Sequence, residues 1–229
     1  MRISIIIPVY NEANTIGLLI NHLYKSAYER SNLEIIVVDG QSTDLTSTVV
    51  KSFQDVVYFR HAKGRALQMN AGAIKATGSV LYFLHCDSYP PLYFDKQICT
   101  AINNTNVAGC FRLNFDSPSL LLQLSQWFTR FNLKICRGGD QSLFITKKLF
   151  IDLGGFNEQY LIYEDNEFIA RIYAKTKFKV LPDKIITSAR RYKKNGFLRL
   201  QYHYTIIHLM NQVGVRPAKL LAYYKRNVR

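Results

Sequence analysis

Hydrophobic residues dominate three runs within the first 90 residues of the chain. The runs extend over residues 3–10, 34–39 and 79–87, and the first two are rich in β-branched side chains. Because none of them alternates regularly with polar positions, they predict strands covered on both faces, as the strands of parallel sheets are.

Between these runs, apolar residues recur at the spacing of amphipathic helices. The pattern predicts helices and one further short strand in the following order: helix 11–29, helix 42–53, strand 56–61 and helix 64–78. Asn11 or Asn14 would cap the first helix, Ser42 or Thr43 the second, and Gly78 would end the third. Strand and helix therefore alternate, which favours an α/β sheet with right-handed crossovers.

The remainder of the chain has a more mixed pattern. It predicts a strand at 108–115, a strongly apolar helix over 118–136, a strand, short helix and turn within 142–158, a helix at 163–177, a short strand at 178–183, and two final helices over 195–214 and 215–227. Gly214 and Pro217 would separate the last two helices.

The composition suits one globular domain. The chain has 229 residues, of which 48% are hydrophobic, enough for a sizeable core. Its four cysteines lack zinc-binding spacing, so we expect reduced, mostly buried thiols in a cytoplasmic protein. No uncharged apolar run reaches the length that crosses a bilayer, and the N-terminal apolar stretch is short for a signal peptide.

The net charge of +14 limits the kinds of partner. Nucleic acid, an anionic membrane surface and phosphorylated substrates would each fit, as would a solvated basic face. The chain shows no helix-turn-helix, RRM or zinc signature, so we expect no nucleic-acid partner. The final helices combine basic and aromatic residues. They would either lie at the inner face of the plasma membrane or pack as an ordinary pair on the domain or in a homodimer.

Two predicted strands end on a carboxylate. Ligands of open α/β sheets bind beyond the carboxyl ends of the strands, where Asp39 and Asp87 would lie. Asp39 could accept hydrogen bonds from a ribose or base, or could stabilise an Asx-turn. Asp87 is suited to hold Mg²⁺ or Mn²⁺ together with a diphosphate. His85, two residues earlier, would be either a second ligand or a core histidine.

The predicted helix at 163–177 begins with an acidic pair. Asp165 shares a helical stripe with Phe168 and Ile172, so it should point inward. Glu164 shares its stripe with Arg171 and should lean toward water. Asp165 would either cap the helix or act as a general base for an acceptor hydroxyl.

The order of these segments resembles a known enzyme family. PVYNE, VDGQSTD, HCD and ED follow one another as in the inverting nucleotide-sugar glycosyltransferases of family 2, which have the GT-A fold. The segments KGRALQMNAGAIKATGSVLYFLHCDS, CFRLNF and GGDQSLFITKKLFIDLGGF are similar to the bacterial radical-SAM/selenodomain-associated transferase 2 subgroup. The resemblance implies a Rossmann-like, mostly parallel sheet flanked by helices. It divides the chain into a GT-A domain at 1–190 and a basic aromatic helical extension at 191–229. Within the domain, residues 1–110 would be the nucleotide-binding half and residues 111–190 the acceptor and catalytic half.

The resemblance also assigns roles to residues. Nucleotide binding falls to Pro8, Tyr10, Glu12, Asp39, Arg65, Asn70 and His85. Asp87 would bind Mg²⁺ or Mn²⁺, and Asp165, paired with Glu164, would be the catalytic base. The sugar, acceptor or diphosphate would meet Gly139, Asp140, Gln141, Arg190 and Arg191.

Two departures from the family pattern refine these expectations. His85 replaces the first acid of the family's D-x-D motif, which would lower metal affinity or place His85 against the ribose. The Gln-x-x-Arg-Trp motif of processive members is missing, which favours transfer of a single sugar. The implied function is metal-dependent transfer from a nucleoside-diphosphate sugar, with UDP-sugar favoured, to a hydroxyl acceptor that could be lipid-linked. The alternatives are a non-catalytic nucleotide-binding or regulatory domain and a nucleotidyltransferase.

Overall fold

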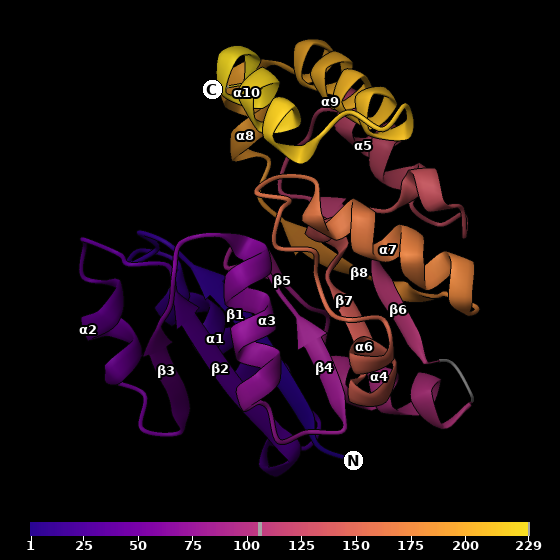
Figure 1. Ribbon diagram of the computed structural model, residues 1–229. Helices are drawn as coiled ribbons and strands as arrows, with labels where there is room; N and C mark the ends of the chain where they lie inside the picture. Colours follow the sequence, from indigo (N-terminus) through magenta and orange to yellow (C-terminus); the bar gives the residue numbers. More distant parts are fainter. Residues whose placement is uncertain (105–106, 229) are drawn as a thin grey trace.

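The strands of the chain form one mixed sheet. The computed structural model describes residues 1–104 and 107–228, and Arg229, the last residue of the expected extension, lies outside them. The strands follow the spatial order β3-β2-β1-β4-β7-β6-β8-β5 (Figure 1). Their bounds are Ile3–Val9 (β1), Leu33–Asp39 (β2), Val56–Arg60 (β3), Val80–Phe83 (β4), Ser88–Tyr89 (β5), Ala108–Phe115 (β6), Leu143–Thr146 (β7) and Lys179–Thr187 (β8).

The N-terminal half of the sheet is parallel and covered on both faces. Strand β1 pairs in parallel with β2 and β4, and β2 pairs in parallel with β3. Ile5 packs with Leu19 of α1 (Ile16–Ser26) on one face, whereas Ile6 packs with Met69 of α3 (Arg65–Lys75) on the other. Helix α2 is Thr46–Lys51. The prediction of an α/β sheet with doubly covered strands is thus confirmed.

The second half of the sheet is mixed. Strand β7 pairs antiparallel with both β4 and β6, and β6 pairs in parallel with β8. The helices of this half are α4 (Phe94–Asn103), α5 (Leu120–Phe128), α6 (Lys147–Asp152) and α7 (Glu164–Lys175), with short 3₁₀ turns at Arg30–Asn32, Lys134–Cys136 and Gly139–Gln141. The expected division between two halves at residue 110 falls inside β6.

Three helices end the chain. They are α8 (Arg190–Asn195), α9 (Phe197–Gln212) and α10 (Pro217–Asn227), and α9 and α10 meet at Gly214, whose φ of +77° favours glycine. Figure 1 shows them at the end of the molecule opposite the N-terminus, together with α5. Within the described part of the chain, no helix has the length and apolar character needed to cross a bilayer.

The prediction of one long helix over 118–136 is wrong. Helix α5 ends at Phe128, and the chain then bends so that the buried guanidinium of Arg137 donates to the carbonyl oxygens of Thr129 and Phe131, both at 2.6 Å. The expected caps also differ. Thr15 and Leu45 precede the first two helices, and α3 ends at Lys75, before Gly78.

Candidate active site

The loops that follow β1 and β2 hold each other in place. Asn11 has a left-handed φ of +54°, its backbone N–H donates to Ser42 Oγ, and its side-chain oxygen accepts from the Thr43 N–H, each at 2.9 Å. The Glu12 N–H donates to Thr46 Oγ1, also at 2.9 Å. The Ser42 hydroxyl therefore bonds to the neighbouring loop and does not cap a helix. Together these bonds fix the turn that carries Glu12.

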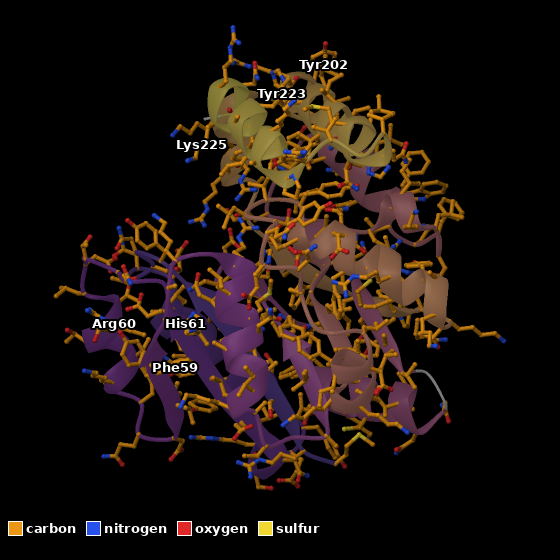
Figure 2. All side chains as sticks on the ribbon, viewed as in Figure 1. Phe59, Arg60, His61, Tyr202, Tyr223 and Lys225 are labelled. Atoms are coloured by element: carbon orange, nitrogen blue, oxygen red, sulfur yellow. The ribbon has the colours of Figure 1, made fainter. Side chains whose placement is uncertain are left out.

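Asp39 lies beneath this edge of the sheet. Its side chain is fully buried, accepts from the Ser42 N–H at 2.8 Å and from the Tyr58 hydroxyl at 2.6 Å, and has Arg60 Nε 3.7 Å away. Figure 2 labels Arg60 together with its chain neighbours Phe59 and His61, at the end of β3. Asp39 therefore stabilises the link that follows β2, but its bond reaches the backbone three residues on, whereas the expected Asx-turn would reach two.

A pocket of about 340 Å³ lies at the carboxyl ends of β1 and β4. It brings together many of the residues singled out from the sequence: Pro8, Tyr10, Glu12, Arg65, His85, Asp87, Asp140, Arg190 and Arg191. We call it the donor pocket. Arginine side chains face carboxylates across it, so both signs of charge are present within one small volume.

Arg190 bridges two carboxylates of the donor pocket. Its Nη2 lies 3.0 Å from Glu12 Oε1 and 3.2 Å from Asp87 Oδ2. A positive group therefore occupies the space between an acid from the end of β1 and an acid that follows β4. A divalent cation would also be attracted to the space between two carboxylates, so Glu12 and Asp87 are compatible with a bound divalent cation.

The donor set around Asp87 is small. In the described residues, His, Cys, Asp and Glu side chains form no group of three that could hold a metal by themselves. An ion at Asp87 would therefore need ligands from a bound diphosphate and water, the usual arrangement for Mg²⁺. His85 does not share in this site, because its ring faces other acids.

His85 joins two carboxylates on the opposite side. Its Nδ1 lies 3.5 Å from Asp140 Oδ1, and its Nε2 lies 3.5 Å from Asp165 Oδ2. Burial alone would lower the pKa of His85, but the two carboxylates outweigh burial and raise the pKa to about 9. Although partial burial opposes ionisation of Asp140, the bond from His85 lowers the pKa of that acid to about 2. At neutral pH His85 is a cation, which is a poor metal ligand.

A second pocket, of about 520 Å³, adjoins the first. The two share Arg65, His85, Asp140, Arg191, Tyr192 and Tyr204, and the second also contains Gly139, Gln141, Glu164 and Asp165. We call it the acceptor pocket. Its walls come from α5 on one side and α9 on the other, with Phe128 and Ile207 among the apolar side chains.

Asp165 points into the acceptor pocket against the backbone of Gly139. The side chain of Asp165 is 12% exposed, and a Cβ atom added to Gly139 would overlap its carboxylate. Only glycine leaves room here, which links the segment at Gly139 to the acid at the start of α7. The expected inward orientation of Asp165 is thus confirmed.

The expectation that Glu164 leans toward water is wrong. Glu164 is 1% exposed, and its Oε1 lies 3.2 Å from Arg65 Nη1 of α3. Its other oxygen, Oε2, is buried and has no hydrogen-bond partner among the described residues. Burial, followed by the charge of Asp165, raises the pKa of Glu164, and Arg65 offsets this only in part. Two adjacent acids therefore line one pocket in different environments.

Asn70 does not reach the donor pocket. Its side-chain oxygen accepts from the Phe156 N–H, and its amide donates to the Phe156 carbonyl and to Glu158, each at 2.9 Å. It fastens α3 to the turn that follows α6. The expected contact between Asn70 and a nucleotide is therefore not supported by its position.

Gln141 is also held internally. Its Oε1 accepts from Arg137 at 2.6 Å, and its amide donates to the Cys136 carbonyl at 2.6 Å. Gln141 lies in the acceptor pocket as expected, but its polar atoms hold the loop that carries Gly139 and Asp140.

Gln68 and Lys63 are among the donor-pocket residues that sequence reasoning missed. Gln68 is buried on α3 and donates to the carbonyl oxygens of Val9 and Val38 at 2.9 and 2.7 Å, which ties the ends of β1 and β2 together. Lys63 places its ammonium 3.3 Å from the centre of the Tyr10 ring. Gln68 could have been noticed as a polar residue within the apolar face of a predicted helix. No sequence pattern singled out Lys63.

Solved structures share this fold. TarS from S. aureus in complex with UDP has a TM-score of 0.70 and 21% identity, with coverage of 82% of this chain and 60% of that one. The mannosyltransferase PcManGT from Pyrobaculum calidifontis, in complex with GDP-Man and Mn²⁺, has a TM-score of 0.69 and 21% identity, with coverage of 93% and 64%. These likenesses confirm the GT-A fold expected from the sequence.

Curated relatives match this chain over only part of their length. Glycosyltransferase AglE from Haloferax volcanii is 30% identical over 111 residues, which are 46% of this chain and 36% of AglE. The probable glycosyltransferase YdaM from Bacillus subtilis is 24% identical over 196 residues, 75% of this chain and 46% of YdaM. The chain thus spans less than half the length of these two relatives. The sequence profile of glycosyl transferase family 2 matches residues 4–157, which are most of the chain. This chain is therefore a member of glycosyl transferase family 2.

Proposed function

We propose that the chain transfers one sugar from a nucleoside-diphosphate sugar to a hydroxyl acceptor, with inversion at the anomeric carbon. The supporting observation is that the donor and acceptor pockets adjoin and share His85, with Asp87 in the first and Asp165 in the second. Family membership supports the same reaction class. The narrower likeness to the radical-SAM-associated subgroup stays a prediction.

The donor pocket suits a nucleoside diphosphate. Lys63, Arg65, Arg190 and Arg191 supply positive charge around it, and Tyr10 and Pro8 supply surfaces for a base or ribose. TarS was solved with UDP, and PcManGT with GDP-Man. UDP-sugar is our first choice of donor and GDP-sugar the second.

A divalent ion, Mg²⁺ or Mn²⁺, would be held by Asp87. Such an ion, when bound, neutralises charge on a departing diphosphate. Arg190 now lies against Asp87, so it would move onto the phosphates as the donor binds. Arg191, shared by both pockets, would face the same leaving group.

The reaction follows from the position of Asp165. The acceptor oxygen forms a bond to the anomeric carbon while the bond from that carbon to the diphosphate oxygen breaks, and Asp165 takes the hydroxyl proton. His85, 3.5 Å away, and the close backbone of Gly139 hold the carboxylate in position. Arginines aimed at the diphosphate stabilise the charge that it gains.

Two variants test the assignment. We expect Asp165→Asn to lose about 10²–10⁴-fold in transfer rate, because a positioned base contributes that much, and to keep its affinity for UDP or GDP in calorimetry. We expect Asp87→Ala to lose the part of nucleotide affinity that Mn²⁺ adds. A thermal-shift screen of UDP- and GDP-sugars with Mn²⁺ selects the donor beforehand.

The outcomes separate the alternatives. An Asp165→Asn protein that turns over like the parent would show that another group is the base. Nucleotide binding by the parent, without sugar transfer or donor hydrolysis, would instead favour a non-catalytic nucleotide-binding domain. Release of pyrophosphate from a nucleoside triphosphate would favour a nucleotidyltransferase.

A further inference from the structure

Helix α5 exposes an apolar stripe. Leu120, Leu124 and Trp127 are 79%, 57% and 44% exposed, and Leu122 is the residue of this helix that is buried. The exposed positions recur at the spacing of one helical face. We define the α5 face as Leu120, Leu121, Leu124, Trp127, Phe128 and Phe131, all of which are exposed.

The α5 face ends in an aromatic cluster with a cation. The Trp127 ring lies 5.3 Å from Phe128 and 5.0 Å from Phe131, and the Arg130 guanidinium lies 4.5 Å from the Trp127 ring. Leucines beside tryptophan, phenylalanine and arginine are typical of helices that lie in a bilayer interface, where an indole ring contacts both headgroups and acyl chains.

The surroundings of the α5 face are strongly basic. From residue 184 to the end, the sequence has eleven lysine and arginine residues and no aspartate or glutamate. This segment comprises the end of β8 and α8 to α10, and α9 lines the acceptor pocket together with α5. In Figure 2, the labelled Tyr202, Tyr223 and Lys225 lie at this same end. Anionic lipid surfaces attract such cations, whereas a second copy of this basic end would be repelled.

The α5 face is continuous with the acceptor pocket. Phe128 belongs to the face and also lines the pocket, as does the neighbouring Ile135, which is 75% exposed. Asp165 lies within the same pocket. An alcohol embedded in a bilayer would therefore reach the acid from the apolar rim, without leaving the lipid.

We propose that the α5 face docks on an anionic bilayer and that the acceptor pocket takes the head of a membrane-embedded alcohol. The identity of the acceptor rests on the proposed function; the docking does not. The apolar side chains would enter the headgroup region, while the cations of α8 to α10 would remain at the lipid surface.

Trp127 reports this docking directly, because it is the single tryptophan of the chain. We expect its emission to shift to shorter wavelength, and brominated lipids to quench it, when vesicles of phosphatidylcholine and phosphatidylglycerol are added. Vesicles of phosphatidylcholine alone should give a weaker response. An unchanged Trp127 spectrum at saturating anionic vesicles would overturn the proposal.

A double variant, Leu120→Glu with Leu124→Glu, tests the face itself. Both positions are exposed, so the fold should persist, and vesicle affinity should fall by about tenfold or more because buried apolar area drives interfacial binding. The matched control is Ile74→Glu on α3, which is 80% exposed and lies away from α5. It should bind vesicles like the parent.

The remaining outcomes also test whether the α5 face docks on lipid. If the double variant still binds vesicles and salt abolishes that binding, the basic helices alone hold the membrane. That result would overturn the role of α5. A blue shift that grows with protein concentration without lipid would show that a second copy covers the face, which also overturns it. Nucleotide calorimetry on the same variants should match the parent, so that a failure of docking is separate from a failure of the proposed transferase activity.

Discussion

Replacing Gly139 by alanine would push a methyl group into the carboxylate of Asp165. The added Cβ would lie 2.6 Å from Asp165 Cγ and 2.9 Å from His85 Cε1. Carbon atoms at rest are about 3.5–4.0 Å apart, so the carboxylate must move by about 1 Å. The φ of Gly139 is not in the left-handed region, so the backbone itself accepts alanine.

The expected cost is in rate more than in stability. A displacement of about 1 Å in a reacting group can cost about 10²-fold, and a loss of that size corresponds to about 2.7 kcal/mol of barrier. The obstructed atoms are the end of a side chain beside a pocket, so we expect the free energy of unfolding to fall by about 1 kcal/mol, the lower limit for overpacking.

The assay compares three quantities in Gly139→Ala and the parent: the transfer rate, the nucleotide affinity by calorimetry and the unfolding midpoint in urea. Gly138→Ala is the matched control, because its added Cβ would meet nothing within 4 Å. A Gly139→Ala rate within about threefold of the parent, a change below about 0.7 kcal/mol, would refute the reasoning. It would mean that the position of Asp165 does not control proton transfer.

Two further predictions concern stability. Burial opposes ionisation of Glu34, but bonds from Ser4 and from the Thr77 N–H at 2.8 Å outweigh burial and lower its pKa. That stabilisation is present above the unfolded pKa and is lost as pH falls through the folded one. Glu34→Gln should therefore lower the free energy of unfolding at pH 7 by about 1–3 kcal/mol. The difference from the parent should shrink below about pH 4.3, which urea titrations at several pH values would measure. A difference that stays constant with pH would contradict this prediction. Asn70→Ala should cost about 1–3 kcal/mol through its lost bonds to Phe156, with UDP affinity unchanged in calorimetry; a loss of affinity at unchanged stability would restore its expected nucleotide contact.

The donor edge of the sheet was predictable because one simple pattern determines it. Continuous apolar runs fix the buried strands, and the polar residues that end them must then lie at the carboxyl edge. Glu12 and Asp87 follow this rule, and both line the donor pocket. The same pattern does not reveal what else approaches that edge. Tyr58 of β3 reaches Asp39 and removes it from the pocket surface.

The acceptor side was less predictable because its contacts come from distant segments. Helical periodicity placed Asp165 inward, but it could not show that Arg65 of α3 covers the neighbouring stripe and buries Glu164. The apolar composition of 118–136 predicted a continuous helix. After Phe128 the chain bends around the buried Arg137, whose partners include the backbone carbonyl groups of Thr129 and Phe131, and no sequence pattern identifies such contacts.

The pairing of β4 with β7 has a mechanical consequence. Tyr82 of β4 lies opposite Phe144 of β7, and β4 is at the same time in register with β1. The hydrogen-bonded ladder therefore runs without a break from β1, which precedes Glu12, through β4 to β7, which follows Gly139. A hinge between the two sides would have to open main-chain bonds. Under the proposed mechanism, the strands on the leaving-group side and the proton-acceptor side therefore keep a fixed spacing. Misalignment of Asp165 would then have to arise in the loops, as in Gly139→Ala.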